Sequence, residues 1–141
     1  MIKTTFFTSF LFFINSIVAF YYHYLLYSFL FFCLAFSSIY YHSGEPSFLN
    51  YNIDQIIILC VVLYGGYMFY NKIIHSPTEL TYQQIIISAL IVFTFLTTIY
   101  LFYYGKILYS YCWHPEPYTA NFWHAVVHII GSIGHVLIMV L

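Results

Sequence analysis

The sequence predicts an all-α integral membrane protein, a helix bundle with about five transmembrane helices and almost no part in water. Of its 141 residues, 63% are hydrophobic and only 5% are charged. Soluble domains are roughly half apolar and one quarter charged. Three lysines, no arginine and four acidic residues cannot cover a water-facing surface, so lipid must surround most of the chain.

The hydrophobic residues divide into segments of the length that crosses a bilayer core of about 30 Å. We expect one transmembrane domain over residues 1–141, without a separate soluble domain and without sequence repeats. The expected helices cover residues 4–20, 22–41, 53–70, 83–104 and 122–141.

Each boundary between the expected helices has its own sequence signal. The cluster Tyr21-Tyr22-His23-Tyr24 separates the first two helices, because aromatic side chains with polar tips favour the membrane interface. The breaker residues Ser43-Gly44-Glu45-Pro46 end the second helix, and Asn52 is a plausible N-cap of the third. The fourth helix is expected to stop at Gly105-Lys106. The two prolines in Trp113-His114-Pro115-Glu116-Pro117 then keep the next segment out of a continuous helix and at the interface.

The first hydrophobic segment has a second interpretation, a cleaved signal peptide from Lys3 to Ala19. Lys3 suits the positively charged start of such a peptide, but Ile17 at the −3 position is a poor cleavage signal. We therefore expect an uncleaved first helix.

The charge and the cysteines argue against other kinds of site. A net charge of −1 excludes a nucleic-acid-binding surface, which needs a basic patch. The cysteines Cys33, Cys60 and Cys112 are odd in number and lack metal-site spacing. They indicate no particular redox compartment.

Polar residues inside membrane spans are costly and are therefore candidates for function. Ser38 and His42 are four residues apart near the end of the second helix, so they share one face. His124 and His128 have the same spacing at the start of the last helix, and Asp54 lies at the start of the third. Following the chain back and forth through the membrane places all of them at one membrane level. This agreement predicts a shared site.

The spacing of the histidines favours a metal ion. His124 and His128 stack on one helix face, which lets both imidazoles reach one ion. His42 would add a third nitrogen ligand and leave a fourth position open, the pattern of catalytic zinc sites. Asp54 could orient a ligand or transfer a proton, and Ser38 could hydrogen-bond the bound water.

Each candidate also has a purely structural interpretation. A pair of histidines can arise by chance, Asp54 can favour the positive end of its helix, and Ser38 can bond to the carbonyl four residues earlier. His135 lies about 10 Å deeper than His128, too far for the same ion, and we expect it to hydrogen-bond a neighbouring helix. The remaining histidines, expected at the interface with His114 as a spare ligand, are His23, His75 and His114.

The set formed by Ser38-x-x-x-His42, Asp54 and His124-x-x-x-His128 resembles the signature of the CREST superfamily of membrane hydrolases. That superfamily includes alkaline ceramidases, progestin/adipoQ receptors, GPI-anchor remodelling hydrolases and myomaker-like proteins. The run from Phe122 to His128 is especially similar to alkaline ceramidases. The resemblance is confined to two short stretches, Ser37 to Ile57 and Phe122 to His135.

The resemblance implies a seven-helix membrane fold that binds zinc through three histidines, here His42, His124 and His128. Asp54 and Ser38 would position the zinc-bound water and steady the oxyanion. The implied substrates are membrane lipids with an amide or ester bond, and the implied location in a eukaryote is the endoplasmic reticulum or Golgi. This chain departs from the family because one span, not three, separates the helix of Asp54 from the last helix. It would be a shortened form whose lipid pocket a homodimer could close.

The leading hypothesis is therefore a zinc-dependent membrane hydrolase, ceramidase-like, that cleaves an amide or ester bond of a membrane lipid. One alternative is a receptor-like or membrane-remodelling protein of the same fold, in which zinc is only structural. Another is a haem-binding or structural subunit of a membrane complex, since histidines in helices also ligate haem iron.

Overall fold

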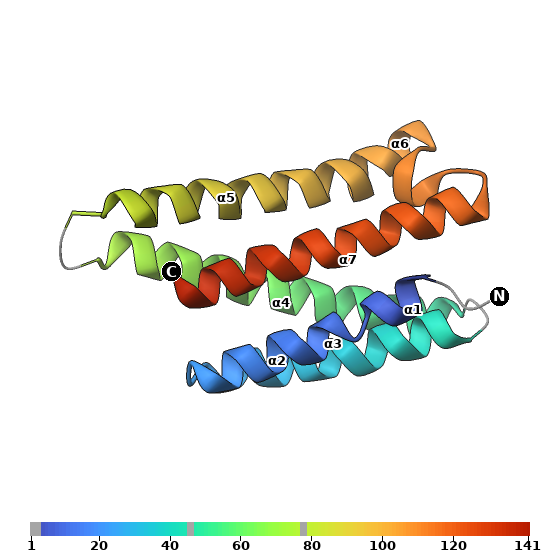
Figure 1. Cartoon of the computed structure of the whole chain (residues 1–141). Helices are drawn as coiled ribbons and strands as arrows, with labels where there is room; N and C mark the ends of the chain where they lie inside the picture. Colours follow the sequence, from blue (N-terminus) through green and yellow to red (C-terminus); the bar gives the residue numbers. More distant parts are fainter. Residues whose placement is uncertain (1–3, 45–46, 77–78) are drawn as a thin grey trace.

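The computed structural model describes residues 4–44, 47–76 and 79–141, and these residues form an all-α bundle without a β-strand (Figure 1). The predicted fold class is confirmed. The elements are α1 (Thr4–Thr8), α2 (Leu11–Tyr21), α3 (Leu25–Ser43), α4 (Phe48–Ile74), α5 (Tyr82–Ile99), the π-helix η1 (Tyr100–Tyr104), α6 (Gly105–Leu108), the 3-10 helix η2 (Tyr111–Trp113) and α7 (Pro117–Val140).

Within the described ranges, five helical segments are long and apolar enough to cross a membrane. They are Thr4–Tyr21, Leu25–Ser43, Phe48–Ile74, Tyr82–Leu108 and Pro117–Val140. Large apolar side chains such as Ile17, Phe48 and Phe93 are more than half exposed on the outside of the bundle. This surface suits lipid, as expected for a multi-pass membrane protein.

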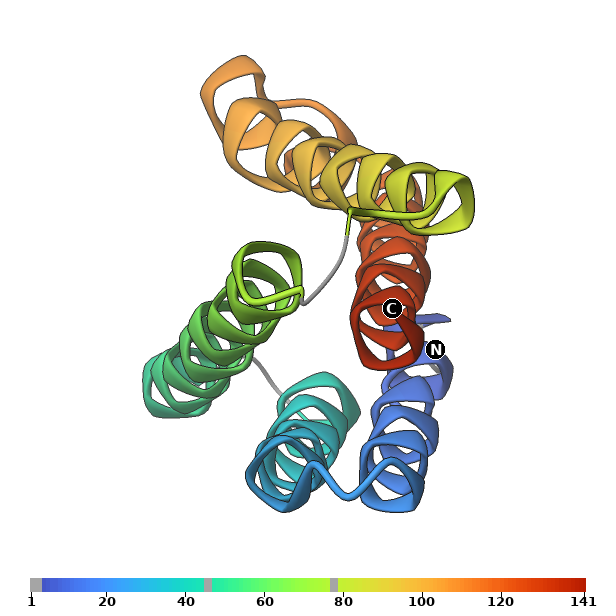
Figure 2. The ribbon, with the colours of Figure 1, turned by 90° about the vertical axis from the view of Figure 1, so that its left-hand side faces the viewer.

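The helices form an incomplete ring, seen end-on in Figure 2. Around the ring the order is α5, α7, α2, α3 and α4, and each helix packs against the next in this series. In the described residues, α4 and α5 do not pack against each other, so the ring is open between them. α7 packs against α1, α2, α4 and α5 and is the hub of the bundle.

The two chain ends lie at opposite ends of the bundle, as an odd number of spans requires (Figure 1). We call the end with α1, α6 and the start of α7 side A, and the end with the C-terminus side B. Side A also contains the end of α3 and the start of α4. The shared membrane level that the sequence predicts for these helix ends is therefore present.

Several helix ends follow the sequence signals. The turn between α2 and α3 falls at residues 22–24, where His23 has a left-handed backbone with φ of 62°. A capping box starts α5: the Thr81 hydroxyl accepts from the Gln84 N–H, and the Gln84 side chain accepts from the Thr81 N–H. Three residues used in the sequence argument, Lys3, Glu45 and Pro46, lie outside the described residues.

Two helices start earlier than expected. α4 begins at Phe48 and not near Asn52, because the Asn52 side chain donates to the Phe48 carbonyl within the helix instead of capping it. α7 begins at Pro117 and not at residue 122. Proline is tolerated in the first helical turn, and the Glu116 carboxylate accepts hydrogen bonds from the backbone N–H groups of Tyr118 and Thr119.

Two helical paths also extend beyond their expected ends. α4 continues to Ile74, past the expected end at residue 70, and the path of α5 continues through η1 and α6 to Leu108. Gly105 was expected to stop this helix, but its backbone is helical, and Tyr109 with φ of 52° ends the path instead. The end of this path, formed by η1 and α6, packs against η2, and η2 packs against α7.

The first span is interrupted between α1 and α2, where a continuous helix was expected over residues 4–20. The Ser9 hydroxyl donates to the Thr5 carbonyl over 2.8 Å, and the Thr8 hydroxyl donates to the same carbonyl over 3.2 Å. Such local bonds compete with the helical backbone pattern and bend helices. The bend directs the hydroxyl groups of Thr5 and Thr8 in α1 toward α7, and that of Ser9 toward α3.

α3 and α7 meet largely through aromatic rings and a buried histidine. The His135 ring lies against Tyr27 and Phe31, with ring centroids 5.7 and 5.2 Å apart. Its Nδ1 also forms a hydrogen bond with the Tyr27 hydroxyl, which confirms that His135 bonds a neighbouring helix. Gly65 of α4 completes this junction, since a Cβ there would lie 2.9 Å from Nδ1 of His135.

Two further polar contacts tie helices together inside the bundle. The Ser132 hydroxyl of α7 donates to Oδ1 of Asn15 in α2 over 2.7 Å. At side B, the Lys72 ammonium of α4 donates to the carbonyls of Ile138 and Met139 over 2.8 and 2.9 Å. A cation at the end of α7 is favourable because the final carbonyls of a helix carry partial negative charge.

The adjacent glycines of α4 offer a matched test of this packing. We expect Gly65→Ala to destabilise the bundle by about 1–3 kcal/mol, because the added methyl group overfills the junction of Tyr27 and His135. Gly66→Ala should have little effect, since a Cβ there meets nothing within 4 Å. Thermal unfolding in detergent measures both. Equal stabilities of the two variants would contradict this packing.

Candidate metal centre

Three predicted histidines converge at side A. His42 lies in the last turn of α3, and His124 and His128 lie one turn apart in the first half of α7. One potential ligand atom from each lies within 4.8 Å of the others. The three pairs of ring centroids are 5.0 to 5.3 Å apart. Residues distant in the sequence thus form one compact cluster.

The geometry of this cluster fits a small metal ion. Nitrogen ligands at 2.0–2.1 Å from a tetrahedral ion are about 3.3 Å apart, so modest ring rotations bring the three nitrogens into position. Imidazole nitrogen suits zinc, copper, iron and nickel. His42 and His128 are buried and His124 is partly buried, so an ion held here would be largely shielded from bulk water.

His128 has a hydrogen-bond partner on α1. Its Nδ1 lies 3.0 Å from the Thr8 hydroxyl. Phe12 of α2 packs on the same ring, with the ring centroids 5.1 Å apart. These two contacts hold the imidazole from the side opposite α7, and the contact with Thr8 leaves Nε2 as the nitrogen for a metal.

Asp54 and Ser38 lie at the same end of the bundle, but their partners differ from those expected. The buried Asp54 carboxylate accepts a hydrogen bond from the Ser37 hydroxyl over 2.8 Å. The Ser38 hydroxyl lies 2.8 Å from the hydroxyl of Ser9. The adjacent serines of α3 thus contact different neighbours, Asp54 of α4 and Ser9 between α1 and α2. Asp54 does not belong to the compact group of ligand atoms.

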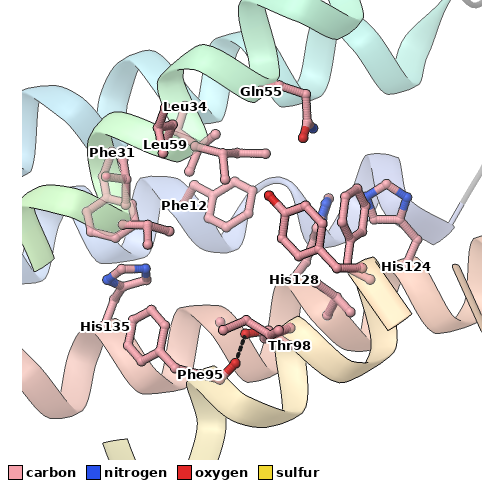
Figure 3. A pocket seen from close by; sticks show the side chains of 18 residues that line it. Phe12, Phe31, Leu34, Gln55, Leu59, Phe95, Thr98, His124, His128 and His135 are labelled. Carbon is pink, nitrogen blue, oxygen red and sulfur yellow. Dashed lines mark hydrogen bonds between the residues drawn. The ribbon is translucent and has the colours of Figure 1, made fainter. Parts of the chain in front are cut away.

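An apolar cavity of about 280 Å³ begins at the cluster and follows α7 (Figure 3). His124 and His128 line one end of it, and His135 lies about 10 Å further along the helix. Side chains of α4 and α5 form two of its walls. Among them, Leu59 is 55% exposed and Ile99 is 52% exposed on the outside of the bundle. The cavity therefore borders the lipid at the opening between α4 and α5.

One polar side chain enters this cavity from α4. Gln55 points its amide into the space between α4 and the two histidines of α7 (Figure 3). Asp54, the preceding residue, does not line the cavity and contacts Ser37 of α3 instead. Gln55 was not a candidate in the sequence analysis, which considered only ionisable groups and Ser38.

A second cavity, of about 240 Å³, lies on the side-A flank of the cluster. His42 and His124 line it, together with Thr5 of α1 and Asn121 of α7. Oδ1 of Asn121 accepts hydrogen bonds from the Thr5 amide and hydroxyl over 3.3 and 2.8 Å. Cys112 also lines this cavity, and burial raises the pKa of its thiol to about 12, so the thiol is neutral near pH 7.

Sequence reasoning missed the hydroxyl groups that α1 and the following Ser9 contribute. Thr5, Thr8 and Ser9 contact Asn121, His128 and Ser38, respectively. The number of spans could have indicated these hydroxyl groups. With five spans the first span begins on the same side as the last, so polar residues at its start lie at the level of the histidine pair.

No protein-family model, characterised protein or solved structure matches this chain. The candidate site therefore rests on the residues and the geometry described above.

Proposed function

We propose that this protein is a zinc-dependent membrane hydrolase that cleaves an amide or ester bond of a membrane lipid. One observation carries the proposal: a cluster of three histidines lies at the end of an apolar cavity that borders the bilayer. The cluster suits a metal ion and the cavity suits an acyl chain. A lipid in the cavity would thus place its carbonyl group beside the ion.

Zinc is the metal that the ligand set supports best. Three neutral imidazoles with an open fourth position are a ligand set of catalytic zinc. When bound, zinc polarises a carbonyl group and lowers the pKa of a water molecule. The same histidines carry the resemblance to the CREST superfamily, and we include membership of that superfamily, in a shortened form, in the proposal.

Asp54 is our candidate for the proton transfer. It is the one acidic residue of the sequence inside a candidate membrane span. It is buried at the level of the histidines, and Ser37 orients its carboxylate. In the proposed reaction Asp54 accepts the proton of the attacking water and passes it to the leaving group. Ser38 is our candidate for hydrogen bonding to the oxyanion. Because the Ser9 hydroxyl donates to the Thr5 carbonyl, Ser38 donates to Ser9 in the structure, and its hydroxyl would have to rotate to reach the oxyanion.

A non-enzymatic protein with a structural zinc is the second candidate. Two observations favour it: Asp54 and Ser38 each form a hydrogen bond with a serine, and neither of them lines a cavity. The haem alternative has less support, because ligand atoms within 4.8 Å of one another suit a single small ion. A homodimer is part of the enzymatic proposal, since a second copy could cover the opening between α4 and α5.

Metal analysis separates ligands from other histidines. We expect about one zinc per chain in the wild type, and loss of stoichiometric zinc in His42→Ala, His124→Ala or His128→Ala, because two imidazoles rarely hold zinc tightly. His23→Ala and His135→Ala should retain it. Elemental analysis of detergent-purified protein measures the content. Zinc retained in His124→Ala, or iron with a haem absorption band in the wild type, would refute the assignment.

Lipid hydrolysis tests the role of Asp54. Asp54→Asn keeps the shape of the side chain and its bond to Ser37 but removes the base. We expect normal zinc content and a loss of hydrolysis of roughly 100-fold or more. The assay measures fatty acid released from ceramides, lysolipids and phospholipids in mixed micelles.

The wild type and Ser38→Ala complete this comparison. Ser38→Ala should lose less activity than Asp54→Asn, on the order of one oxyanion hydrogen bond. Unchanged hydrolysis by Asp54→Asn would reject this proton acceptor. A zinc-loaded wild type that cleaves none of these lipids, as monomer or dimer, would favour the structural zinc.

A further inference from the structure

The histidine cluster lies between two cavities that differ in their lining. We propose that the second cavity admits water and the polar part of the lipid from side A, while the acyl chain occupies the first. This inference rests on the proposed function and extends it to the way in which the substrate is divided.

The lining residues place the cluster between the cavities. His124 lines both cavities, His128 lines the first and His42 lines the second. An ion held by these three side chains would therefore face both spaces. A substrate with its carbonyl group at the ion can extend one part into each cavity.

The chemistry of the second cavity suits water. Most of the residues that line it carry polar groups, among them Thr5, Tyr41 and Asn121, whereas aliphatic and aromatic residues dominate the lining of the first cavity. Pro117, at the start of α7, also lines the second cavity and is exposed at side A. The second cavity thus reaches the membrane surface, where water is present.

Hydrolysis of a lipid favours this division. The reaction consumes one water molecule and releases a fatty acid and an alcohol or amine. The first cavity borders hydrocarbon, and moving a polar product through it without hydrogen-bond partners costs several kcal/mol. A separate polar route avoids this cost and sets the substrate class: a lipid whose acyl chain faces the bilayer and whose polar part faces side A.

Thiol labelling tests the route without requiring zinc. In a chain with Cys33, Cys60 and Cys112 replaced by alanine, Ala120→Cys places a thiol in the second cavity, and Ile129→Cys places one on the exposed outer face of α7. Both proteins are reconstituted in sealed phosphatidylcholine vesicles, and Ser43→Cys marks side A. We expect a membrane-impermeant maleimide to label Ala120→Cys from side A about tenfold or more faster than Ile129→Cys, because hydrocarbon excludes the reagent. Equal, slow labelling of both would overturn the proposal.

Zinc removal supplies the second measurement. We expect labelled Ala120→Cys to retain its zinc against a water-soluble chelator that strips the unlabelled protein. Gly131→Leu fills the first cavity, since its Cβ would meet its nearest neighbour at 3.9 Å, and it should lose zinc like the wild type. If Gly131→Leu retained its zinc and labelled Ala120→Cys lost it, the chelator would enter through the first cavity, and the assignment of the two cavities would be reversed. Labelling from side A in a protein that holds no zinc would support the water route but contradict the proposed function.

An independent observation assigns a positioning role to Thr8. Its hydroxyl lies 3.2 Å from the Thr5 carbonyl, to which it donates, and 3.0 Å from Nδ1 of His128. A hydroxyl has one proton, so Thr8 accepts from the Nδ1–H of His128. We infer that Thr8 holds His128 in the tautomer with an unprotonated Nε2, the form that can bind a metal. Partners of this kind fix the orientation and the tautomer of metal-binding histidines.

Two substitutions of Thr8 test this role. Thr8→Val keeps the shape without the hydroxyl, and we expect zinc affinity to fall about 10- to 100-fold in chelator competition. Thr8→Ser should restore most of it. In zinc-free protein, ¹⁵N NMR of labelled histidine should show Nδ1–H for His128 in the wild type and a tautomer mixture in Thr8→Val. An identical tautomer and affinity in Thr8→Val would overturn the inference, whereas a wild type with the expected tautomer but no zinc would count only against the proposed function.

Discussion

The bundle depends on one constraint: polar groups in a lipid-embedded chain must find partners among the helices, because hydrocarbon offers none. α7 has the central place because it carries polar groups along much of its length. Asn121, His128, Ser132 and His135 contact α1, α2 and α3 in turn. Because the hydrophobic effect does not favour contact between helices over contact with lipid, these bonds and the close packing at Gly65 specify which helices meet.

The same constraint accounts for the character of the site. The hydroxyl groups of Thr8 and Ser9 interrupt the first span, and the bend turns them toward His128 and Ser38, respectively. The ring is open between α4 and α5 because, in the described residues, no polar contact joins these two helices. A cluster of polar side chains therefore lies beside an apolar cavity with access to lipid. That combination, and not the fold class, supports a lipid-directed activity.

The sequence predicted which residues lie near the histidine cluster, but not which hydrogen bonds they form. Span count and helix spacing were enough to bring His42 to the pair on α7. They were not enough to show that Asp54 bonds Ser37, or that Gln55 and not Asp54 enters the cavity. Adjacent residues of a helix point about 100° apart, so a small rotation of α4 about its axis decides which of the two faces the cavity. The apolar residues of α4 surround it almost evenly, and their pattern does not set that rotation.

The sequence by itself determined the number of spans and the end of the bundle at which each polar residue lies. Both follow from the fixed thickness of the hydrocarbon layer and the rise of 1.5 Å per helical residue. Only the tertiary structure decided how each helix is rotated, where the first span bends and which side of the ring stays open. Those properties depend on hydrogen bonds and close contacts between helices distant in the sequence, such as Thr8 with His128 and Tyr27 with His135. Depth is a property of one helix, whereas rotation is a property of its neighbours.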